Sequence, residues 1–417
     1  MSLSPTYIDL FAGAGGLSEG FIRAGYKPLA HVENDKAACF TLKTRLAYHY
    51  LNNIKNLEPY IEYLKGTISR AKLYSYIPEE ILLSVINRTI GPDNAIIFDE
   101  IDKLLNKRKV DLIIGGPPCQ AYSLVGRARS NDGMRSDPRN HLYVQYACYL
   151  QKYNPKYFVF ENVLGIKSAK QGTYLKNIEK LFLKKGYIMK LYTLSANDFG
   201  VLQNRKRIII LGWQKDINIK LPDLETIRMG TDFKVESIFN DLPSINAGEG
   251  VDKFISYRTE INEYLEQKSI RNGIDVLTQH IARPHTEQDK KIYLIAVNKW
   301  NNKRQRLDYN DLPDILKTHK NRHSFFDRFK VVASDLPYSQ TVVAHIAKDG
   351  HYYIHPDLNQ NRSISVREAA RLQSFPDDYY FEGVKDSSNR TASFKQIGNA
   401  VPPLMANIIA KEFKFLF

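Results

Sequence analysis

Short apolar runs alternate with amphipathic stretches through the first half of the chain. Residues 6–11 (TYIDLF) predict a strand, 13–16 a glycine turn, 17–24 an amphipathic helix, and 28–32 (PLAHV) a second strand that ends at Glu33. A strand, a tight turn and a helix in this order are typical of the start of a doubly wound α/β sheet.

Further apolar runs predict the rest of the sheet. They follow a stretch at about 36–95 with the periodicity of helices, and helical patterns separate them from one another. The expected strands are 95–98, 110–114, 157–160 and 207–211. Strands that are apolar on both faces and alternate with helices favour a mostly parallel sheet with helices on both sides.

The pattern changes near residue 213, where the periodicity weakens and Asn, Asp, Lys and aromatic residues dominate until about 360. Helical patterns return at 365–375 and 402–415. The predicted parts are an α/β domain at 1–212 with a helical insertion at about 36–95, a smaller irregular domain at 213–360, and a C-terminal segment at 361–417 that returns to the first domain.

Composition narrows the class of protein. The 417 residues are 43% hydrophobic and 25% charged, which suits a globular chain and disfavours a disordered or fibrous one. No run approaches the roughly 18 apolar residues of a membrane helix, and the first residues do not resemble a signal peptide, so we expect a cytoplasmic protein. Three cysteines are too few for a disulfide framework or a four-cysteine zinc site, so no metal is expected.

The net charge of +14 is concentrated in two windows. Residues 151–190 hold nine Lys against two Glu, and residues 290–330 hold eleven Lys and Arg against four Asp, so each window has a charge of +7. Taken alone, the first window is better explained by solvated lysines on helix faces. Aromatic residues and histidines interleave the second, which favours a nucleic-acid surface.

Two loops at predicted strand ends carry candidate chemistry. Glycines at 13–16 let backbone N–H groups approach a ligand, and Glu33 lies where an acid can accept both hydroxyls of a ribose. This pair indicates an adenosine-type nucleotide, with a purely structural turn as the alternative, and does not separate a dinucleotide from S-adenosylmethionine. In GGPPCQ (115–120), two glycines and two prolines frame Cys119 in a way that a core cysteine would not need. Cys39 and Cys148 lie in amphipathic stretches and are expected in the core.

The motifs of this chain resemble, in the same order, those of the DNA cytosine carbon-5 methyltransferases of bacterial restriction-modification type. The resemblance spans nearly the whole chain. Its motifs are DLFAGAGG (9–16), GGPPCQAYS (115–123), ENV (161–163), QNRKR (203–207), RSISVREAARLQSFPDDY (362–379) and QIGNAVPP (396–403).

The resemblance implies a Rossmann-like, S-adenosylmethionine-dependent methyltransferase fold with 213–360 as a target-recognition domain. It implies that Cys119 adds to carbon 6 of a flipped-out cytosine and that Glu161 stabilises the ring. Arg205 and Arg207, two apart on an expected strand, should point to one face, and we expect Arg207 to hold the cytosine O2.

The same resemblance assigns binding residues. Expected cofactor contacts are Asp9, Phe11, Ala12, Gly13, Gly15, Gly16, Glu33, Asn34, Pro117, Leu142 and Asn399. Expected DNA contacts are Gln120, Ser123, Arg127, Gln203, Lys303, Arg304 and Arg306. Where the family usually has Gly-Asp-Ile after the third strand this chain has Phe98-Asp99-Glu100-Ile101, so either Asp99 or Glu100 is expected to contact the adenine.

We therefore expect a monomeric enzyme that methylates carbon 5 of cytosine in a specific sequence of double-stranded DNA, with a possible restriction endonuclease that cuts the same site. The alternatives are a tRNA cytosine-5 methyltransferase, which would use the same motifs, and a catalytically silent DNA-binding protein. The neutral charge of the extra residues between Glu33 and Asp99 argues against a DNA-binding insertion. The motifs do not give the recognition sequence.

Overall fold

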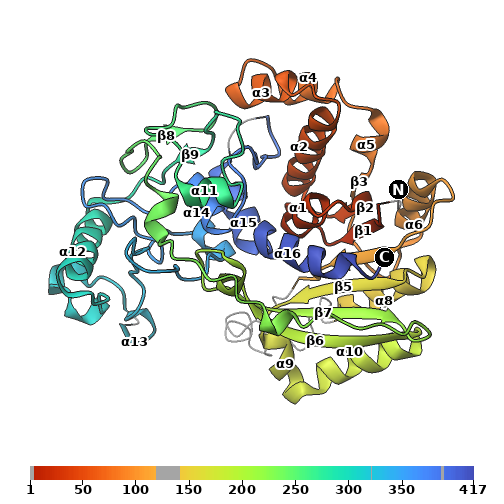
Figure 1. Cartoon of the computed structure of the whole chain (residues 1–417). Coiled ribbons are helices and arrows are strands. Elements are labelled where there is room, and N and C mark those ends of the chain that lie inside the picture. The colour runs from red at the N-terminus through yellow and green to blue at the C-terminus, as the bar shows by residue number, and fades with distance from the viewer. Residues whose placement is uncertain (1–3, 119–140, 321, 387–388) are drawn as a thin grey trace.

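The structure is a computed structural model of the chain, and it describes residues 4–118, 141–320, 322–386 and 389–417. A sheet with helices on both faces forms one part of the molecule, on the right in Figure 1, and a part with few regular elements lies beside it. Short helices from the C-terminal segment lie between the two.

The sheet has seven strands in the order β3-β2-β1-β4-β5-β7-β6. β1 to β5 are parallel, and β7 is antiparallel to both β5 and β6. The strands are β1 (Thr6–Leu10), β2 (Lys27–Glu33), β3 (Val85–Asn87), β4 (Leu112–Gly115), β5 (Tyr157–Asn162), β6 (Tyr187–Ser195) and β7 (Lys206–Gln214). This confirms the predicted mostly parallel α/β sheet.

Helices of the first part are α1 (Gly16–Arg23), α2 (Lys36–Asn53), α3 (Glu58–Lys65), α4 (Arg70–Tyr74), α5 (Glu79–Leu83), α6 (Ala95–Leu105), α8 (Leu142–Tyr153), α9 (Gly165–Ser168) and α10 (Thr173–Lys184). Later elements are β8 (Gly250–Val251), α11 (Glu263–Gln267), β9 (His280–Ile281), α12 (Glu287–Lys303), α13 (Arg322–Phe325), α14 (Val366–Leu372), α15 (Arg390–Asn399) and α16 (Pro403–Lys414). Helices were predicted at the positions of α14 and α16, which the structure confirms.

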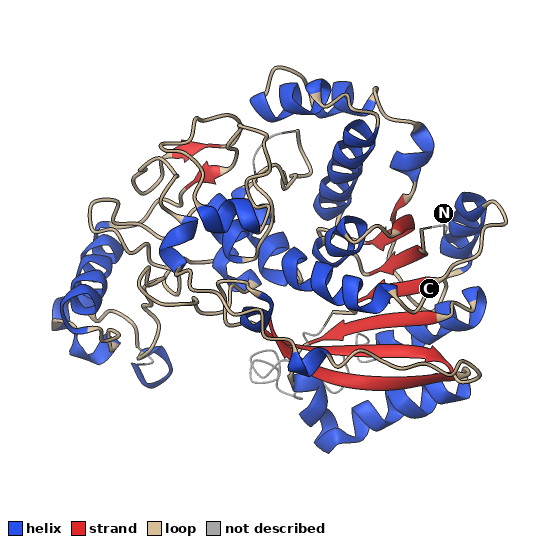
Figure 2. Ribbon diagram, viewed as in Figure 1, coloured by secondary structure: helices blue, strands red, loops and turns tan. Residues whose placement is uncertain are grey.

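Apolar side chains on both faces of the central strands fix the layers. Along β5, Phe158 and Phe160 pack toward α8 and α10, whereas Tyr157 and Val159 pack toward α16. All four are at least 97% buried, as expected for a strand covered on both faces. Figure 2 shows the helices of the two layers above and below the sheet.

The strand predicted at 95–98 is wrong, because these residues begin α6. Four consecutive apolar residues resemble a buried strand, but the periodicity continues as a helix: Ile97, Ile101 and Leu105 are buried, while Ile96 is 55% exposed. The third strand of the sheet is instead the short β3, within the stretch predicted as helical. β6, in which only Tyr187, Tyr192 and Leu194 are buried, was also missed.

The helices predicted within about 36–95 are observed as α2 to α5, and the description of this stretch as an insertion stays a prediction. Tyr60 and Tyr63 of α3 are buried, and Arg70 of α4 pairs with Glu382 of the C-terminal segment at 3.2 Å. The Nζ of Lys253, from the irregular part, lies 3.6 Å above the ring of Tyr63. This stretch therefore contacts both later parts of the chain.

The C-terminal segment joins the other two parts. Apolar residues of α14 and α15 share one core with residues such as Ile238 and Val332 of the irregular part. Beside that core, the guanidinium group of Arg371 binds Asp241 at 2.5 Å and Asp377 at 2.5 Å, and all three side chains are buried. The domain limits given above stay predictions.

The last helix returns to the first one. α16 packs along α1, and the Asn407 side chain donates to the Gly20 carbonyl at 3.1 Å. A Cβ at Gly20 would lie 2.4 Å from that of Ala406, so the close approach of these helices requires glycine. The hydroxyl of Tyr26 donates to the Ala410 carbonyl at 3.1 Å.

Among the described residues, no helix has the length and hydropathy needed to cross a membrane.

Candidate active site

The glycine turn after β1 is tightly packed against two later segments. Gly13 and Gly15 have φ angles of +56° and +81°, which favour glycine. A Cβ at Gly15 would lie 2.9 Å from the hydroxyl oxygen of Tyr379, and one at Gly16 would lie 2.3 Å from the carbonyl oxygen of Val401. The structure thus brings the QIGNAVPP motif, which contains Val401, onto the turn.

Glu33 shapes this turn from the end of β2. Its Oε2 accepts the N–H of Gly13 at 2.8 Å, and its Oε1 accepts the N–H groups of Asn34 and Asp35 at 2.9 and 2.8 Å. Burial raises the pKa of the Glu33 carboxyl, while these three donors oppose that rise. The carboxylate predicted to bind a ribose also holds the turn in place.

Asp9 is the buried acid of the same motif. Its side chain is 1% exposed, and Oδ2 has no hydrogen-bond partner within the described residues. Burial, followed by the nearby charge of Glu33, raises the pKa of Asp9 well above its usual value. A buried acceptor without a donor is costly unless a ligand satisfies it, so this observation fits a bound group that carries a hydrogen-bond donor.

The other predicted cofactor residues lie in the glycine turn or at the ends of other strands and helices. Phe11 is in the left-handed region, with a φ of +58°, and Ala12 donates its N–H to the Val32 carbonyl at 3.2 Å. Pro117 is buried just after β4, Leu142 is the first residue of α8, and Asn399 is the exposed last residue of α15.

Asp99 and Glu100 are not at a strand end. Both lie on α6, where Asp99 pairs with Lys103 at 2.6 Å and Glu100 pairs with Arg88 at 2.9 Å. The strand at 95–98 on which that prediction rested is absent, whereas the contact of Asp99 or Glu100 with the adenine stays a prediction. The residue at the end of β3 is Asn87, whose side chain donates to the Glu33 carbonyl at 3.1 Å.

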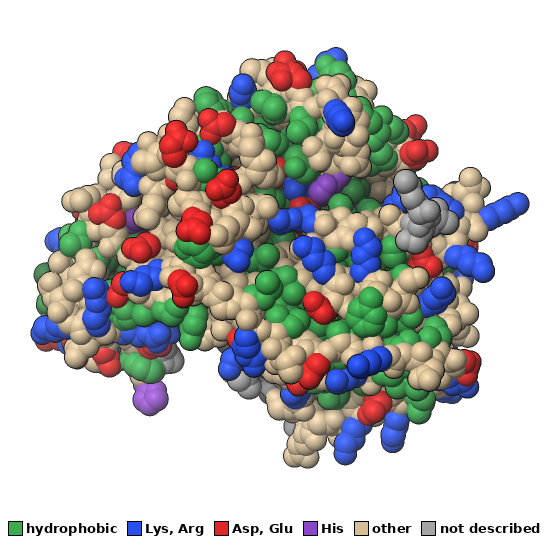
Figure 3. Space-filling model, viewed as in Figure 1, with side chains coloured by type: hydrophobic (Ala, Val, Ile, Leu, Met, Phe, Trp, Pro, Cys, Tyr) green, Lys and Arg blue, Asp and Glu red, His purple; other side chains and the backbone are tan. Residues whose placement is uncertain are grey.

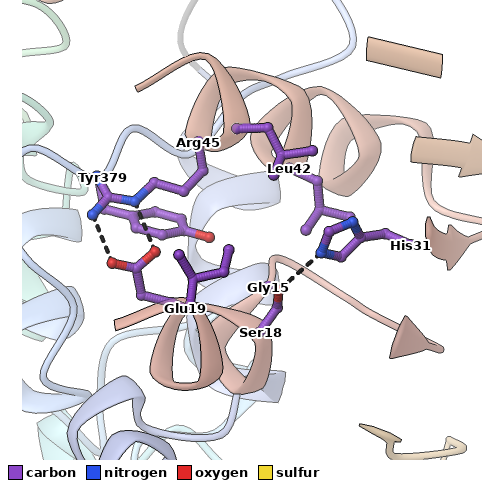
Figure 4. Close-up of a pocket in the computed structure, with 9 residues that line it drawn as sticks. Gly15, Ser18, Glu19, His31, Leu42, Arg45 and Tyr379 are labelled. Carbon is purple, nitrogen blue, oxygen red and sulfur yellow. Dashed lines mark hydrogen bonds and ion pairs between the residues drawn. The ribbon is translucent and has the colours of Figure 1, made fainter. Parts of the chain in front are cut away.

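A small cavity lies behind the glycine turn (Figure 4). Ser18 donates to or accepts from His31 Nε2 at 2.8 Å, and Arg45 binds Glu19 through two hydrogen bonds of 2.9 and 2.6 Å. Burial lowers the pKa of His31 to about 4, so this histidine is neutral. The network connects α1, β2 and α2 and holds the turn from behind.

Glu161 and Arg207 form the second half of the site. Glu161 lies near the end of β5, and the Nε of Arg207 on β7 lies 2.8 Å from its Oε1. The two side chains are 13% and 12% exposed. A Cβ at Gly116 would lie 2.6 Å from Glu161 Oε2, so the backbone that leads to Cys119 passes directly beside this carboxylate.

Arg205 and Arg207 have different partners in the structure, and their joint contact with a substrate stays a prediction. Arg205 precedes β7 and is fully buried, where it donates to the carbonyls of Val342 at 2.7 Å and Gly398 at 3.2 Å. Alternation along a strand does not apply to a residue outside the strand. Arg205 connects the irregular part to the C-terminal segment.

Gln203 was predicted to contact DNA, and its burial contradicts this. It is fully buried, its Nε2 donates to the Leu372 carbonyl at 2.8 Å, and its Oε1 accepts the N–H of Val342 at 2.9 Å. Its amide is used within the protein, at the same junction as Arg205. The predicted residues Cys119, Gln120, Ser123 and Arg127 lie outside the described residues.

The basic residues of the two windows differ in position and pairing. Lys303 and Arg306 are exposed at and after the end of α12, and Arg304 pairs with Asp335 at 3.2 Å. In the first window, Lys185 lies at the end of α10 that is remote from the irregular part in Figure 1. The first window is therefore not one continuous surface facing the irregular part.

Sequence reasoning missed Asn162. It follows Glu161, and its buried Nδ2 has no hydrogen-bond partner within the described residues, while its Oδ1 accepts the N–H of Val163 at 2.9 Å. A polar residue at the end of an otherwise apolar strand was the available signal. Glu161 and Arg207 bring an acid and a cation together at the strand ends, whereas Asn162, the next residue of β5, points to the opposite face of the sheet.

This arrangement separates two chemical tasks. The turn with Asp9 and Glu33 offers hydrogen-bond acceptors beside a glycine backbone, which suits a ligand with ribose hydroxyls and an amino group. Glu161 and Arg207 offer a proton donor or acceptor and a fixed cation, which suits stabilisation of charge on a polar ring. In the described part of the chain, no group of three or more His, Cys, Asp or Glu could hold a metal ion.

Comparisons with known proteins agree with this arrangement. The family model described as C-5 cytosine-specific DNA methylase matches residues 6–67 and 87–414. A Type II methyltransferase of Bacillus paralicheniformis is 44% identical, with 98% of each chain covered, and one of Haemophilus parahaemolyticus is 31% identical, covering 98% of this chain and 86% of that one.

Solved structures share the fold. A protein encoded within a prophage of Escherichia coli aligns with a TM-score of 0.65 at 22% identity over 99% of each chain. The Entamoeba histolytica methyltransferase EhMeth aligns with a TM-score of 0.56 at 15% identity over the full length of both.

Because the matching family consists of DNA methylases, the tRNA alternative is not supported. The chain belongs to the C-5 cytosine-specific DNA methylases, and it is an enzyme that methylates carbon 5 of cytosine in DNA.

Proposed function

We propose that Cys119 is the nucleophile and that Glu161 assists it. Carbon 5 of cytosine is a poor nucleophile, so the Cys119 thiolate adds to carbon 6 and makes carbon 5 able to attack a methyl group. In its acid form Glu161 gives its proton to ring nitrogen 3 as the adduct forms, and it takes that proton back afterwards. Once carbon 5 carries the methyl group, the carbon-5 proton leaves to water and the bond between carbon 6 and the Cys119 sulfur breaks, which restores the aromatic ring and the thiolate. The observation that carries this proposal is the contact between the Glu161 carboxylate and Gly116, three residues before Cys119.

Arg207 is proposed to hold the base. Its ion pair with Glu161 at 2.8 Å fixes the guanidinium group beside the same carboxylate, where its remaining N–H groups can bind the cytosine O2. The target cytosine is flipped out of the duplex, since carbon 6 is not accessible in a stacked base pair.

The methyl donor is proposed to be S-adenosylmethionine, which supplies an electrophilic methyl group when bound. Glu33 would accept its ribose hydroxyls, and the unpartnered Oδ2 of Asp9 would accept a donor of the ligand. The remaining proposed contacts are Phe11, Ala12, Gly13, Gly15, Gly16, Asn34, Pro117, Leu142 and Asn399.

Double-stranded DNA of a specific sequence is the proposed substrate, with 213–360 as the recognition domain, 1–212 as the catalytic domain and 361–417 joining them. Lys303, Arg304 and Arg306 are proposed to contact phosphates, and Gln120, Ser123 and Arg127 to contact the flipped nucleotide and its strand. The enzyme would act as a cytoplasmic monomer, and a restriction endonuclease for the same site is a possible partner.

Replacement of Cys119 tests the mechanism. Cys119→Ser should reduce methyl transfer to duplex DNA by at least about three orders of magnitude and abolish covalent trapping by a 5-fluorocytosine substrate, since the thiolate is lost. Cys148→Ser is the matched control, because Cys148 lies half-buried on α8, and it should keep both properties. A trapped adduct in Cys119→Ser would exclude the proposed nucleophile.

A further inference from the structure

The basic residues of the 290–330 window fall into two groups. Six of them pair with an acid, which partly neutralises them; these are Lys290, Lys299, Arg304, Lys317, Arg328 and Lys330. The other five are exposed and form no ion pair with a described residue; these are Lys291, Lys303, Arg306, Lys320 and Arg322. The uncompensated charge is therefore confined to α12 and its C-terminal end, and to α13.

The surroundings of α13 differ from those of the end of α12. Phe325 faces inward, where the His319 ring stacks on it at 4.0 Å between centroids and 7° between planes. Tyr309 contacts Phe325 at 4.9 Å and stacks over Phe329 at 5.9 Å. α13 is therefore anchored to the irregular part by packing of aromatic rings.

The next residue, Phe326, faces outward. Its side chain is 50% exposed, whereas the side chain of Phe325 is partly buried against the core residues Tyr309 and Phe329. Arg322 and His323 are exposed on the same short helix, and Lys320 is exposed just before it. An exposed ring among uncompensated cations has the composition of a nucleic-acid contact.

The position of α13 is consistent with that partner. In Figure 1, α13 is at the lower tip of the irregular part, on the side that faces α9. Figure 3 shows the surface hollowed between that tip and the lobe that carries α9. α9 begins at Gly165, four residues after Glu161, so the opposite side of this hollow belongs to the catalytic domain.

We propose that α13 and Phe326 are the part of this protein that reads the DNA sequence. Arg322 and His323 supply hydrogen-bond donors for base edges, Phe326 supplies a ring for stacking or for a thymine methyl group, and Lys320 binds a phosphate. Lys303 and Arg306, which lie at and after the end of α12, bind phosphates only. This inference rests on the proposed assignment of 213–360 as the recognition domain.

Two substitutions in the full-length enzyme test the inference. Arg322→Gln and Phe326→Ala should each lower kcat/KM on the enzyme's own site by about 5- to 150-fold, the effect of losing one good base contact. Bisulfite sequencing of genomic DNA from cells that express each variant should show methylation at additional sites that differ from the original at one position. Unchanged kcat/KM and an unchanged site in both variants would overturn the proposal.

Matched variants distinguish a loss of sequence recognition from a loss of positive charge and from a loss of stability. Lys303→Gln should weaken binding equally at all sequences, reduce the log–log salt slope by about 0.9, and leave the methylated site unchanged. Leu183→Ala removes a side chain that is 56% exposed on α10 and should change neither property. Arg322 is exposed, so Arg322→Gln tests the proposal even if Phe326→Ala lowers the melting temperature.

The result is independent of the catalytic proposal. If Cys119→Ser kept its activity, the nucleophile would be wrong, yet Arg322→Gln could still relax the site. If Arg322→Gln and Phe326→Ala left the site unchanged while Cys119→Ser was inactive, only the role of α13 would be wrong.

Discussion

The central sheet and the junction made by the C-terminal segment are both buried, but different interactions stabilise them. In the sheet, β4 and β5 are covered on both faces by apolar side chains, such as Ile113 and Phe158. At the junction, Arg362, Arg367 and Arg371 are each fully buried, and the carboxylates of Glu368, Asp241 and Asp377 compensate them. The sheet is stabilised by apolar burial, whereas the junction depends on a complete set of partners.

This difference has a functional counterpart. The residues proposed for catalysis lie at strand ends of the apolar sheet, where a substitution can change the chemistry without disturbing the core. The residues by which the C-terminal segment joins the irregular part to the sheet are charged and mutually dependent, so a single substitution there should affect the stability of the whole protein.

Replacement of Glu161 should have the largest effect on catalysis. Glu161→Gln keeps the shape but cannot act as an acid, so we expect kcat to fall by about 10²- to 10⁴-fold, measured with labelled methyl donor at saturating DNA. The exposed Glu179 on α10 provides the control, since Glu179→Gln should retain wild-type kcat. A kcat within a few-fold of wild type for Glu161→Gln would remove this residue from the proposed mechanism.

At the junction the expected effect is on stability. Arg371→Met leaves Asp241 and Asp377 as buried charges without their main partner, so the free energy of unfolding should fall by about 3–5 kcal/mol in urea denaturation. Lys103→Met, which breaks the exposed pair with Asp99, should produce no measurable change. If Arg371→Met were as stable as wild type, apolar packing would dominate the junction too, and the comparison would fail.

A smaller difference is expected in the response to pH. Burial is the main cause that lowers the pKa of His280 and His285 to about 4 and that of His355 to about 3, and all three lie in 213–360. Their full contribution to stability is present above the unfolded pKa of about 6.5. As pH falls from there toward 4, the unfolded chain binds protons that the folded chain does not, and stability is lost.

A single substitution isolates this effect. In that range each histidine contributes up to about 1.4 kcal/mol per pH unit to the slope of the free energy of unfolding against pH. His355→Gln should therefore reduce this slope by up to that amount between pH 6 and 4. The comparison must be with wild type, because Glu33 and Glu382, whose pKa values burial raises, act in the opposite direction. Equal slopes for the two proteins would show that His355 does not contribute.

The sequence predicted those elements and site residues whose contacts are made within the same strand or motif. β1, β4, β5 and β7 were predicted because apolar residues on both faces of a strand are visible in the strand itself. Asp9, Glu33 and Glu161 were identified at strand ends, since their positions depend on neighbours in the same motif. These residues lie where the sequence and the resemblance predicted them.

The remaining errors have two physical causes. Ala95 to Phe98 form four apolar residues in a row, and such a run fits a buried strand and the first turn of a helix equally well. Gln203 carries the polar groups of a substrate contact, but it bonds to Val342 and Leu372, more than 130 residues away. The spacing of residues within a motif does not indicate partners that are so distant in the sequence.

The packing of α16 on α1 has a consequence for the order in which the protein folds as it is made. α1 leaves the ribosome among the first residues, yet the Gly20 surface that Ala406 and Asn407 cover is completed only by the last. At about 5–20 residues per second, an apolar face of the first helix therefore stays uncovered during most of synthesis. A chain that stops before residue 401 should therefore expose this face of α1, because the residues that cover Gly16 and Gly20 lie at 401 and 406.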